Sequence, residues 1–263
     1  MPLFTFDSYN LLSSFLVILA IQMLCFAIAA VFKTDKLTDL SYGMTFVLLS
    51  AFYLLASSEA GILYQILNWA VILWGMRLAI YLFIRILRIK HDHRFDGRRE
   101  NALAFLNFWL LQTIAIWLIQ LPLTIHLQKN QSGSWSIWST VGLAAFALGF
   151  VYETIADWQK FRFRNQPGNS GKFMNRGLWR FSRYPNYFGE LVIWWGLFLS
   201  LIPVYTGWGW LALISPLFIT FLLLKVSGIP LLEQSMQQRY GSDPLYQEYR
   251  RKTSLLLPWI PQR

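Results

Sequence analysis

The stretch Tyr9–Phe32 reads YNLLSSFLVILAIQMLCFAIAAVF and contains no Asp, Glu, Lys or Arg. A helix that crosses a bilayer needs about 20 mostly apolar residues. The run is too long for the apolar part of a secretory signal, and the segment Met1–Asn10 supplies no basic residues ahead of it. We therefore predict a membrane-spanning helix here.

Six further stretches of the same character follow along the chain. Their approximate limits are Asp39–Ala56, Ile62–Ile89, Ala102–Leu127, Trp135–Trp158, Tyr187–Tyr205 and Trp208–Val226. No internal repeat or low-complexity linker separates them. The sequence therefore predicts an all-α, polytopic membrane protein, a bundle of seven transmembrane helices in one domain that covers residues 1–263.

The composition agrees with a bilayer environment. Hydrophobic residues make up 56% of the chain and charged residues only 14%, whereas soluble domains carry roughly 25% charged residues. The net charge of +10 is explained by basic residues that collect in cytoplasmic loops of membrane proteins. We therefore expect no nucleic-acid partner. The single cysteine, Cys25, excludes an internal disulfide.

The basic residues also predict an orientation. All lysines and arginines except Arg77 and Lys129 lie on the same side of the seven predicted helices, at helix ends, in loops or in the tail. This bias marks the cytosolic side. With an odd number of spans, the N-terminus lies outside and the C-terminus in the cytosol, and we expect the inner (plasma) membrane of a bacterium.

The fifth predicted helix ends with two acidic residues on one face. Glu153 and Asp157 are four residues apart, and Arg164 follows two turns later if the helix continues. Charged groups at membrane depth usually face a cavity or a partner. A carboxylate face beside an arginine suits the ribose hydroxyls and phosphate of a nucleotide. A structural ion-pair cluster at the interface is the alternative.

The segment Asn165–Glu190 is rich in glycine and basic residues. Such a segment can bind phosphate through backbone N–H groups and arginine side chains, although a solvated loop that follows the positive-inside bias has the same composition. Pro185 is suited to the start of a helix. Asn186 and Glu190 then lie one turn apart and face the same cavity.

A polar stripe crosses the third predicted helix. Arg77, Tyr81 and Arg85 recur every four residues, and Asp39 in the second helix can pair with Arg77 if the two helices pack together. A structural salt bridge and an active-site role are both open. Glu59, at the outer end, is expected to be solvated. We expect no metal site, since His91 and His93 have no evident partner ligands.

Three segments together resemble a known family. They read ETIADWQKFRFR (Glu153–Arg164), GLWRFSRYPNYFGELVIWWG (Gly177–Gly196) and SGIPLLEQSMQQRYGSDPLYQEYRRKTSLLLPWIP (Ser227–Pro261). They are similar to the bacterial branch of the steroid 5-alpha-reductase-like integral membrane proteins. The wider superfamily includes NADPH-dependent reductases of enone and sterol double bonds and also the isoprenylcysteine-type methyltransferases.

The resemblance implies that the two halves of the chain have different roles. Residues from about 135 to 263 bind the cofactor, with cytosolic loops that cap its cavity, and residues from about 1 to 130 form the substrate side. With Glu153 from the acidic face, the implied NADPH contacts are Asp157, Arg164, Arg180, Asn186, Tyr187 and Glu190, and in the tail Glu233, Tyr246, Tyr249 and Arg250. The family uses a Glu in helix two and a Tyr in helix three to hold the substrate carbonyl. Here the nearest equivalents are Asp39 and Tyr81.

The implied activity is the reduction of an activated C=C bond in an apolar enone, steroid-like or another lipid, that enters from the bilayer. Tyr81 would donate a hydrogen bond to the substrate carbonyl. Asp39 or Arg77 would adjust how strongly Tyr81 donates. Two alternatives stay open. One is an S-adenosylmethionine-dependent methyltransferase of a lipid or isoprenylated substrate, because that branch shares a similar motif. The other is a non-enzymatic lipid-binding bundle.

Overall fold

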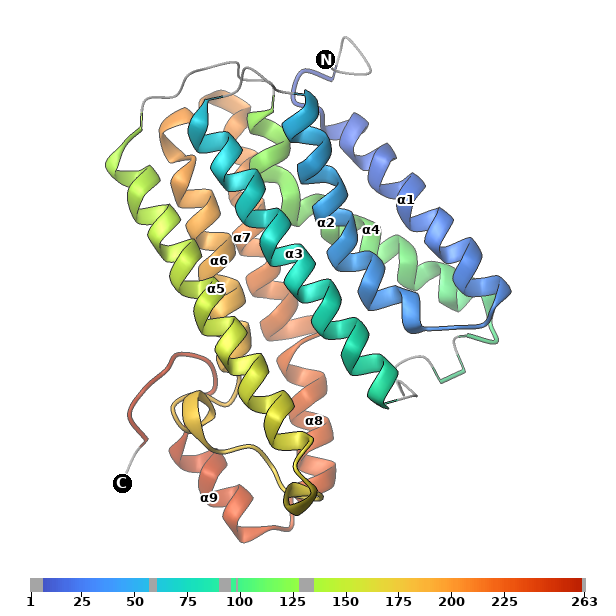
Figure 1. Cartoon of the computed structure of the whole chain (residues 1–263), viewed down its shortest axis with the longest axis vertical. Helices are drawn as coiled ribbons and strands as arrows, with labels where there is room; N and C mark the ends of the chain where they lie inside the picture. Colours follow the sequence, from blue (N-terminus) through green and yellow to red (C-terminus); the bar gives the residue numbers. More distant parts are fainter. Residues whose placement is uncertain (1–6, 57–60, 90–95, 98, 128–134, 262–263) are drawn as a thin grey trace. The chain divides into compact units, whose positions relative to one another are not determined.

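The computed structural model describes residues 7–56, 61–89, 96–97, 99–127 and 135–261, and within these ranges the chain is helical with no strand. Seven of its helical segments are long and apolar enough to cross a membrane (Figure 1). The prediction of an all-α bundle with seven spans is therefore confirmed, and the fold is that of an integral membrane protein.

Five of the seven spans are single α-helices, namely α1 (Leu11–Val31), α2 (Lys36–Ala56), α3 (Ile62–Ile89), α4 (Ala102–His126) and α5 (Ile137–Arg164). The sixth span consists of α6 (Pro185–Ser200) and the short 3-10 turn η4 (Ile202–Val204) that follows it. Two further 3-10 turns lie between α5 and α6: η2 (Pro167–Asn169) and η3 (Gly177–Arg180). As expected, Pro185 begins α6. α5 continues to Arg164, beyond the predicted limit at Trp158.

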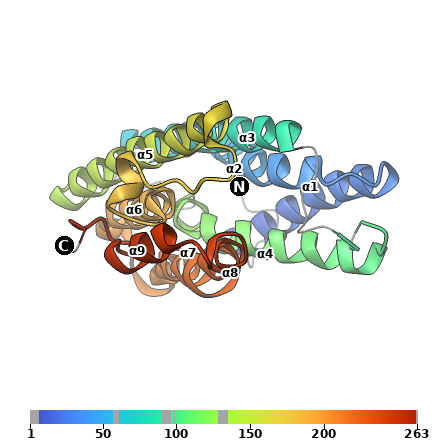
Figure 2. The same ribbon diagram turned by 90° about the horizontal axis from the view of Figure 1, so that it is seen from below.

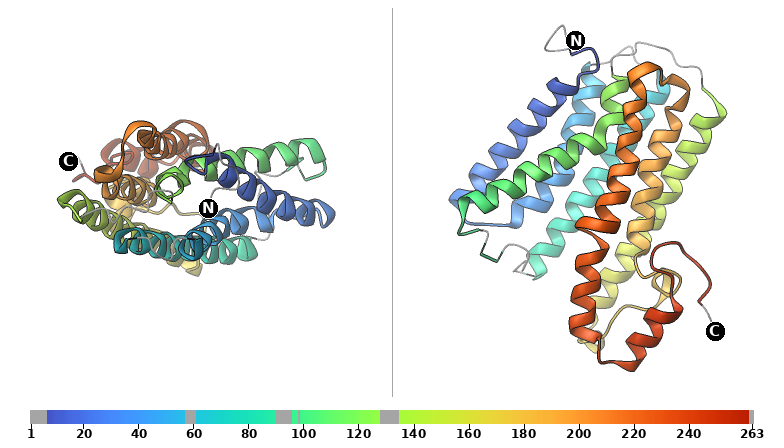
Figure 3. Two further views of the ribbon diagram at one scale, coloured as in Figure 1. Left: turned by 90° about the horizontal axis from the view of Figure 1, so that it is seen from above. Right: turned by 180° about the vertical axis from the view of Figure 1, so that it is seen from behind.

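The last span differs from the single helix predicted over Trp208–Val226. It is built from η5 (Gly207–Leu213), α7 (Ile214–Phe221), the π-helical η6 (Leu222–Val226) and α8 (Ile229–Tyr240), and α9 (Pro244–Lys252) follows it. Gly228 marks the break, because a Cβ there would lie 2.5 Å from the carbonyl oxygen of Leu223. Figure 3 shows α7 continuing through this irregular turn into α8.

The chain divides into two compact units. The first comprises residues 1–139 and 201–215 and contains α1–α4 and η5. Its α2 and α3 approach closely at small residues, since a Cβ on Gly43 would lie 2.9 Å from both the Gly75 carbonyl oxygen and the Ala79 Cβ. Small residues at helix contacts are typical of membrane bundles.

Buried amides and hydroxyls also connect α1, α2 and α4 in the first unit. The Gln112 Nε2 donates to Gln22 Oε1 at 2.9 Å and to Ser41 Oγ at 3.1 Å, and Gln22 Nε2 donates to Thr45 Oγ1 at 2.8 Å. Such bonds between transmembrane helices contribute on the order of 1 kcal/mol each. The network fixes how these three helices face one another.

The second unit comprises residues 140–200 and 216–263. Its α5 and α6 run antiparallel in contact, because a Cβ on Gly149 would lie 2.7 Å from the Gly189 carbonyl oxygen and one on Gly196 would lie 2.7 Å from the Gly142 carbonyl oxygen. The loop after α5, together with α8 and α9, forms the end of this unit (Figures 1 and 2).

Candidate functional site

The acidic face of α5 meets the start of α6. Glu153 and Asp157 are only 3% and 5% exposed, although α5 continues as an exposed, basic turn to Arg164. A Cβ on Gly189 would lie 2.8 Å from both the backbone nitrogen and the Cβ of Glu153. The missing side chain at Gly189 therefore lets the two helices bring Glu153 against the turn that carries Glu190.

Asn186 and Tyr187 occupy the first turn of α6 and are half-buried. The Oδ1 atom of Asn186 is buried and accepts no hydrogen bond from the described part of the chain. The Tyr187 ring stacks on Tyr184, with centroids 5.8 Å apart and planes 15° apart. The start of α6 thus presents a buried acceptor beside a pair of stacked rings.

Hydrogen bonds hold the loop after α5 against its neighbours. The Trp179 indole N–H donates to the Ala156 carbonyl at 3.0 Å, and the Leu178 N–H donates to Gln159 Oε1 at 2.9 Å. From α9, the Tyr249 hydroxyl donates to the Trp179 carbonyl at 2.6 Å. Burial raises the pKa of Tyr249 above its usual range, so the phenol stays protonated and keeps donating.

The Glu233 carboxylate on α8 is surrounded by several hydrogen-bond donors. It accepts hydrogen bonds from Arg183 Nη1 at 2.6 Å and from the Tyr184 hydroxyl at 2.7 Å, and Arg250 Nε lies 3.5 Å away. Burial, followed by the hydrogen bond to Glu233, raises the pKa of Tyr184 well above its usual range. Tyr246 is buried nearby, and the centroid of its ring lies 5.3 Å from that of Phe173.

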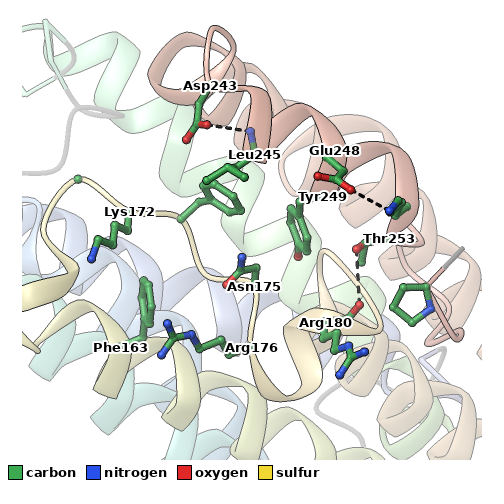
Figure 4. A pocket seen from close by; sticks show the side chains of 14 residues that line it. Phe163, Lys172, Asn175, Arg176, Arg180, Asp243, Leu245, Glu248, Tyr249 and Thr253 are labelled. Atoms are coloured by element: carbon green, nitrogen blue, oxygen red, sulfur yellow. Dashed lines mark hydrogen bonds and ion pairs between the residues drawn. The ribbon is translucent and has the colours of Figure 1, made fainter. Parts of the chain in front are cut away.

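A cleft of about 490 Å³ opens between the loop and α9 (Figure 4). Aromatic rings of Phe163, Phe173 and Tyr249 line it, together with the basic side chains of Lys172, Arg176, Arg180 and Lys252. Lys252 pairs with Glu248 at 2.8 Å. Asp243 also lines the cleft, but within the described ranges no carboxylate forms an ion pair with the other three basic residues. The basic side chains of the lining therefore outnumber its acidic ones.

The predicted cofactor contacts thus fall into three groups of the second unit. Glu153, Asp157, Asn186, Tyr187 and Glu190 lie on α5 and α6, with Arg164 exposed at the end of α5. Glu233 and Arg250 belong to the group of donors around the Glu233 carboxylate, and Tyr246 lies beside it. Arg180 and Tyr249 line the cleft.

Sequence reasoning did not single out several residues that complete these groups. They are Lys172, Arg176 and Phe173 in the cleft and Arg183 and Tyr184 at Glu233. A signal for the basic residues is present, because Lys172, Arg176 and Arg180 recur every four residues in the glycine-rich segment.

The predicted substrate residues lie in the first unit. Asp39 forms an ion pair with Arg85 at 2.8 Å, two turns from Arg77 on the same face of α3. The pairing of Asp39 with Arg77 stays a prediction. Tyr81 lies between the two arginines and is half-buried, as Arg77 is. The structure therefore brings the Asp39 carboxylate to the end of the predicted stripe.

Three other predictions, on Glu59, His91 and His93, lie outside the described residues. In the ranges that the structure does cover, no group of three or more His, Cys, Asp or Glu side chains is placed to hold a metal ion.

Comparison with known proteins assigns the chain to a family. A family described as "Protein of unknown function (DUF1295)" matches residues 25–253, which is most of the chain and covers most of each unit. The chain belongs to the DUF1295 family. This membership supports the resemblance at the level of the family, since DUF1295 is the steroid 5-alpha-reductase-like one.

A more distant relative is a protein of Schizosaccharomyces pombe described as uncharacterized. It is 25% identical over 174 residues, which cover 57% of this chain and 47% of the relative. The chain thus spans about half the length of this curated relative. No solved structure matches the chain.

Proposed function

We propose that this DUF1295 protein is an NADPH-dependent reductase of an activated C=C bond in an apolar enone, steroid-like or another lipid, of the bacterial branch and the inner membrane. The observation that carries the proposal is the cleft of the second unit, whose basic side chains outnumber its two carboxylates, Asp243 and Glu248, and which has aromatic rings beside them.

The cleft fits one end of a phosphate-bearing dinucleotide. Its volume of about 490 Å³ is within the roughly 300–1,000 Å³ of small-molecule sites. Arg176 and Arg180 offer planar donor groups that match phosphate oxygens, and Lys172 adds a point charge. Nucleobases stack on aromatic side chains, and the half-buried ring of Tyr249 is the proposed surface for this contact. S-adenosylmethionine has no phosphate, so the basic lining favours NADPH over the methyltransferase alternative.

The acidic face of α5 and the start of α6 supply acceptors. The carboxylates of Glu153 and Asp157 and the Oδ1 of Asn186 are buried oxygens. Such oxygens accept hydrogen bonds from ribose hydroxyls or from a carboxamide N–H. Because these residues and the cleft belong to one compact unit, the second unit contains both cationic and acceptor groups for a dinucleotide.

The first unit supplies the groups proposed to act on the substrate. When bound, NADPH supplies the hydride, and this chemistry belongs to the cofactor. Tyr81 is proposed to donate a hydrogen bond to the enone carbonyl, which stabilises negative charge that develops on the oxygen. Asp39 and Arg85 form the charged end of the stripe, and Arg77 adds positive charge one turn from Tyr81.

NADPH binding tests the cofactor part of the proposal. Arg176→Gln should weaken NADPH affinity by about 1.5–3 kcal/mol, the range for a hydrogen bond to a charged group, as measured by cofactor fluorescence in detergent. Arg251→Gln is the matched control, because Arg251 is an exposed arginine of α9 that does not line the cleft. Unchanged NADPH affinity in Arg176→Gln, or binding of S-adenosylmethionine in its place, would contradict the proposal.

Turnover tests the substrate part separately. Tyr81→Phe should lower turnover of an enone by about 10²–10³, the usual loss when one such donor is removed, with NADPH affinity retained. Glu59→Gln should be close to the unchanged protein. The assignment of Tyr81 fails if Tyr81→Phe turns over normally while Glu59→Gln is inactive.

A further inference from the structure

The tail after α9 exposes large apolar side chains outside the seven spans. Residues 255–260 read LLLPWI, and Leu257, Trp259 and Ile260 are 64%, 73% and 77% exposed. Phe181, in the loop before α6, is also exposed. Single exposed apolar residues are ordinary, but a contiguous group marks an interaction surface.

Backbone hydrogen bonds hold this tail on one path. The Trp259 N–H donates to the Phe181 carbonyl at 3.0 Å, and the Arg183 N–H donates to the Ser254 carbonyl at 2.9 Å. Between them, the Ser182 hydroxyl donates to the Leu256 carbonyl at 2.8 Å. The tail is therefore fixed beside residues 181–183, directly before the first residue of α6.

That position corresponds to the membrane boundary. The span that contains α6 begins at Pro185, and Phe181 lies four residues earlier in a non-helical stretch that can reach at most about 14 Å. The polar interface on each side of the hydrocarbon core is roughly 5–7 Å thick. The tail thus lies at or just outside the lipid headgroups, beside the start of the span.

A tryptophan on α5 marks the same depth. Because α5 and α6 are antiparallel with Glu153 against Gly189, Trp158 lies about level with Pro185. Trp158 is exposed, and the Arg162 guanidinium lies 5.4 Å from its ring centre. Tryptophan and basic residues of this kind are typical of membrane interfaces.

The tail also continues into a surface inside the span. Leu256 and Leu257 line an apolar groove of about 300 Å³ together with residues of α6, among them Phe188, Leu191 and Trp195. Since these α6 residues belong to a membrane span, one apolar surface extends from the span to the tail. This continuity identifies the lipid bilayer as what covers the tail.

We propose that residues 255–260 are an interfacial membrane anchor, which inserts Leu257, Trp259 and Ile260 at the boundary between headgroups and acyl chains. Lys252, Thr253 and Pro261, on either side of the anchor, line the basic cleft. The anchor therefore holds the cleft at the membrane surface. This inference is independent of what the cleft binds.

Fluorophore quenching by lipids tests the anchor. In full-length protein with Cys25→Ser, which removes the only cysteine, Trp259→Cys is labelled with an environment-sensitive fluorophore and reconstituted in lipid nanodiscs. Lipids brominated near the headgroup should cause a loss of fluorescence at this position. Ser242→Cys is the control, since Ser242 is exposed in the turn between α8 and α9, and its label should keep its intensity.

The outcomes separate the possible coverings of the tail. If the emission of the label at position 259 is neither blue-shifted nor quenched, the label is exposed to water. This result would overturn the proposed anchor. Label that is blue-shifted but not quenched by brominated lipid is covered by protein, such as a second copy of the chain, and also overturns it. Ile260→Cys repeats the measurement at a neighbouring side chain, so that a local effect of losing Trp259 does not decide the result.

Discussion

Glu233 shows how one residue can organise the end of the second unit. Its carboxylate accepts from Arg183 and Tyr184 and lies close to Arg250, so it connects α8 to the residues before α6 and to α9. The Arg183 side chain is only 14% exposed. Its positive charge therefore depends on Glu233 for compensation.

We expect Glu233→Gln to lower the free energy of unfolding by about 1–3 kcal/mol, because a largely buried charged donor loses its partner. Thermal unfolding in detergent would measure it. Glu248→Gln removes an exposed carboxylate that pairs with Lys252 one turn away, and exposed pairs of this kind contribute little. Equal stability of the two variants would show that the Glu233 cluster is not a stabilising one.

Residues at this scale were only partly predictable. Glu233 was singled out through a resemblance, yet Arg183 and Tyr184 were not, because partners distant in sequence are set by how α8 folds back. The ion pair between Asp39 and Arg85 was not singled out for a similar reason. The register between α2 and α3 is set by close contact at Gly43 and Gly75, which hydropathy does not reveal.

At the scale of elements, the α5–α6 pair depends on glycine. Gly189→Ala should destabilise the protein by about 1–3 kcal/mol, the usual cost of overpacking, because the new Cβ would lie under 3 Å from the backbone of Glu153. Size-exclusion profiles after heating would measure the loss. Gly168→Ala is the matched control, since nothing lies within 4 Å of a Cβ there. Equal stability of the two variants would contradict tight packing of α5 and α6 at Gly189.

Helix limits followed from hydropathy where a span is regular. The seven predicted stretches agree with the seven spans, because length and apolar content are what a bilayer requires. The last span is the exception. This span is divided into η5, α7 and η6 and is broken at Gly228. These features depend on local backbone geometry, which hydropathy averaged over a window of residues does not detect.

For the whole molecule, the distribution of basic residues predicts the topology. A reporter that is active only in the cytosol should give signal when fused after Arg263 and none when fused after Lys129, because the basic loops stay on the cytosolic side. The reverse pattern would refute this orientation. The same measurement would decide which side of the membrane the basic cleft faces.

The sequence indicated many residues of the candidate site but not which of them lie together. The acidic face of α5 and the start of α6 were visible as helical spacings, and the structure places Glu153 against the turn of Gly189. The cleft was not, because it forms only when the loop after α5 meets α9 through Trp179 and Tyr249. Contacts between segments some 70 residues apart have no signature in local sequence.

The close contact of α5 and α6 also has a consequence for biogenesis. α5 carries two carboxylates: Asp157 lies next to Trp158 at the interface, and Glu153 lies one turn deeper. At that depth an acidic residue costs part of the roughly 2.5–3.5 kcal/mol that it costs at the centre of an inserting helix. Glu153 and Asp157 are shielded in the finished protein, with Gly189 of α6 directly against Glu153. We therefore expect α5 to leave the translocon together with α6, as a helical hairpin, rather than to partition into lipid by itself.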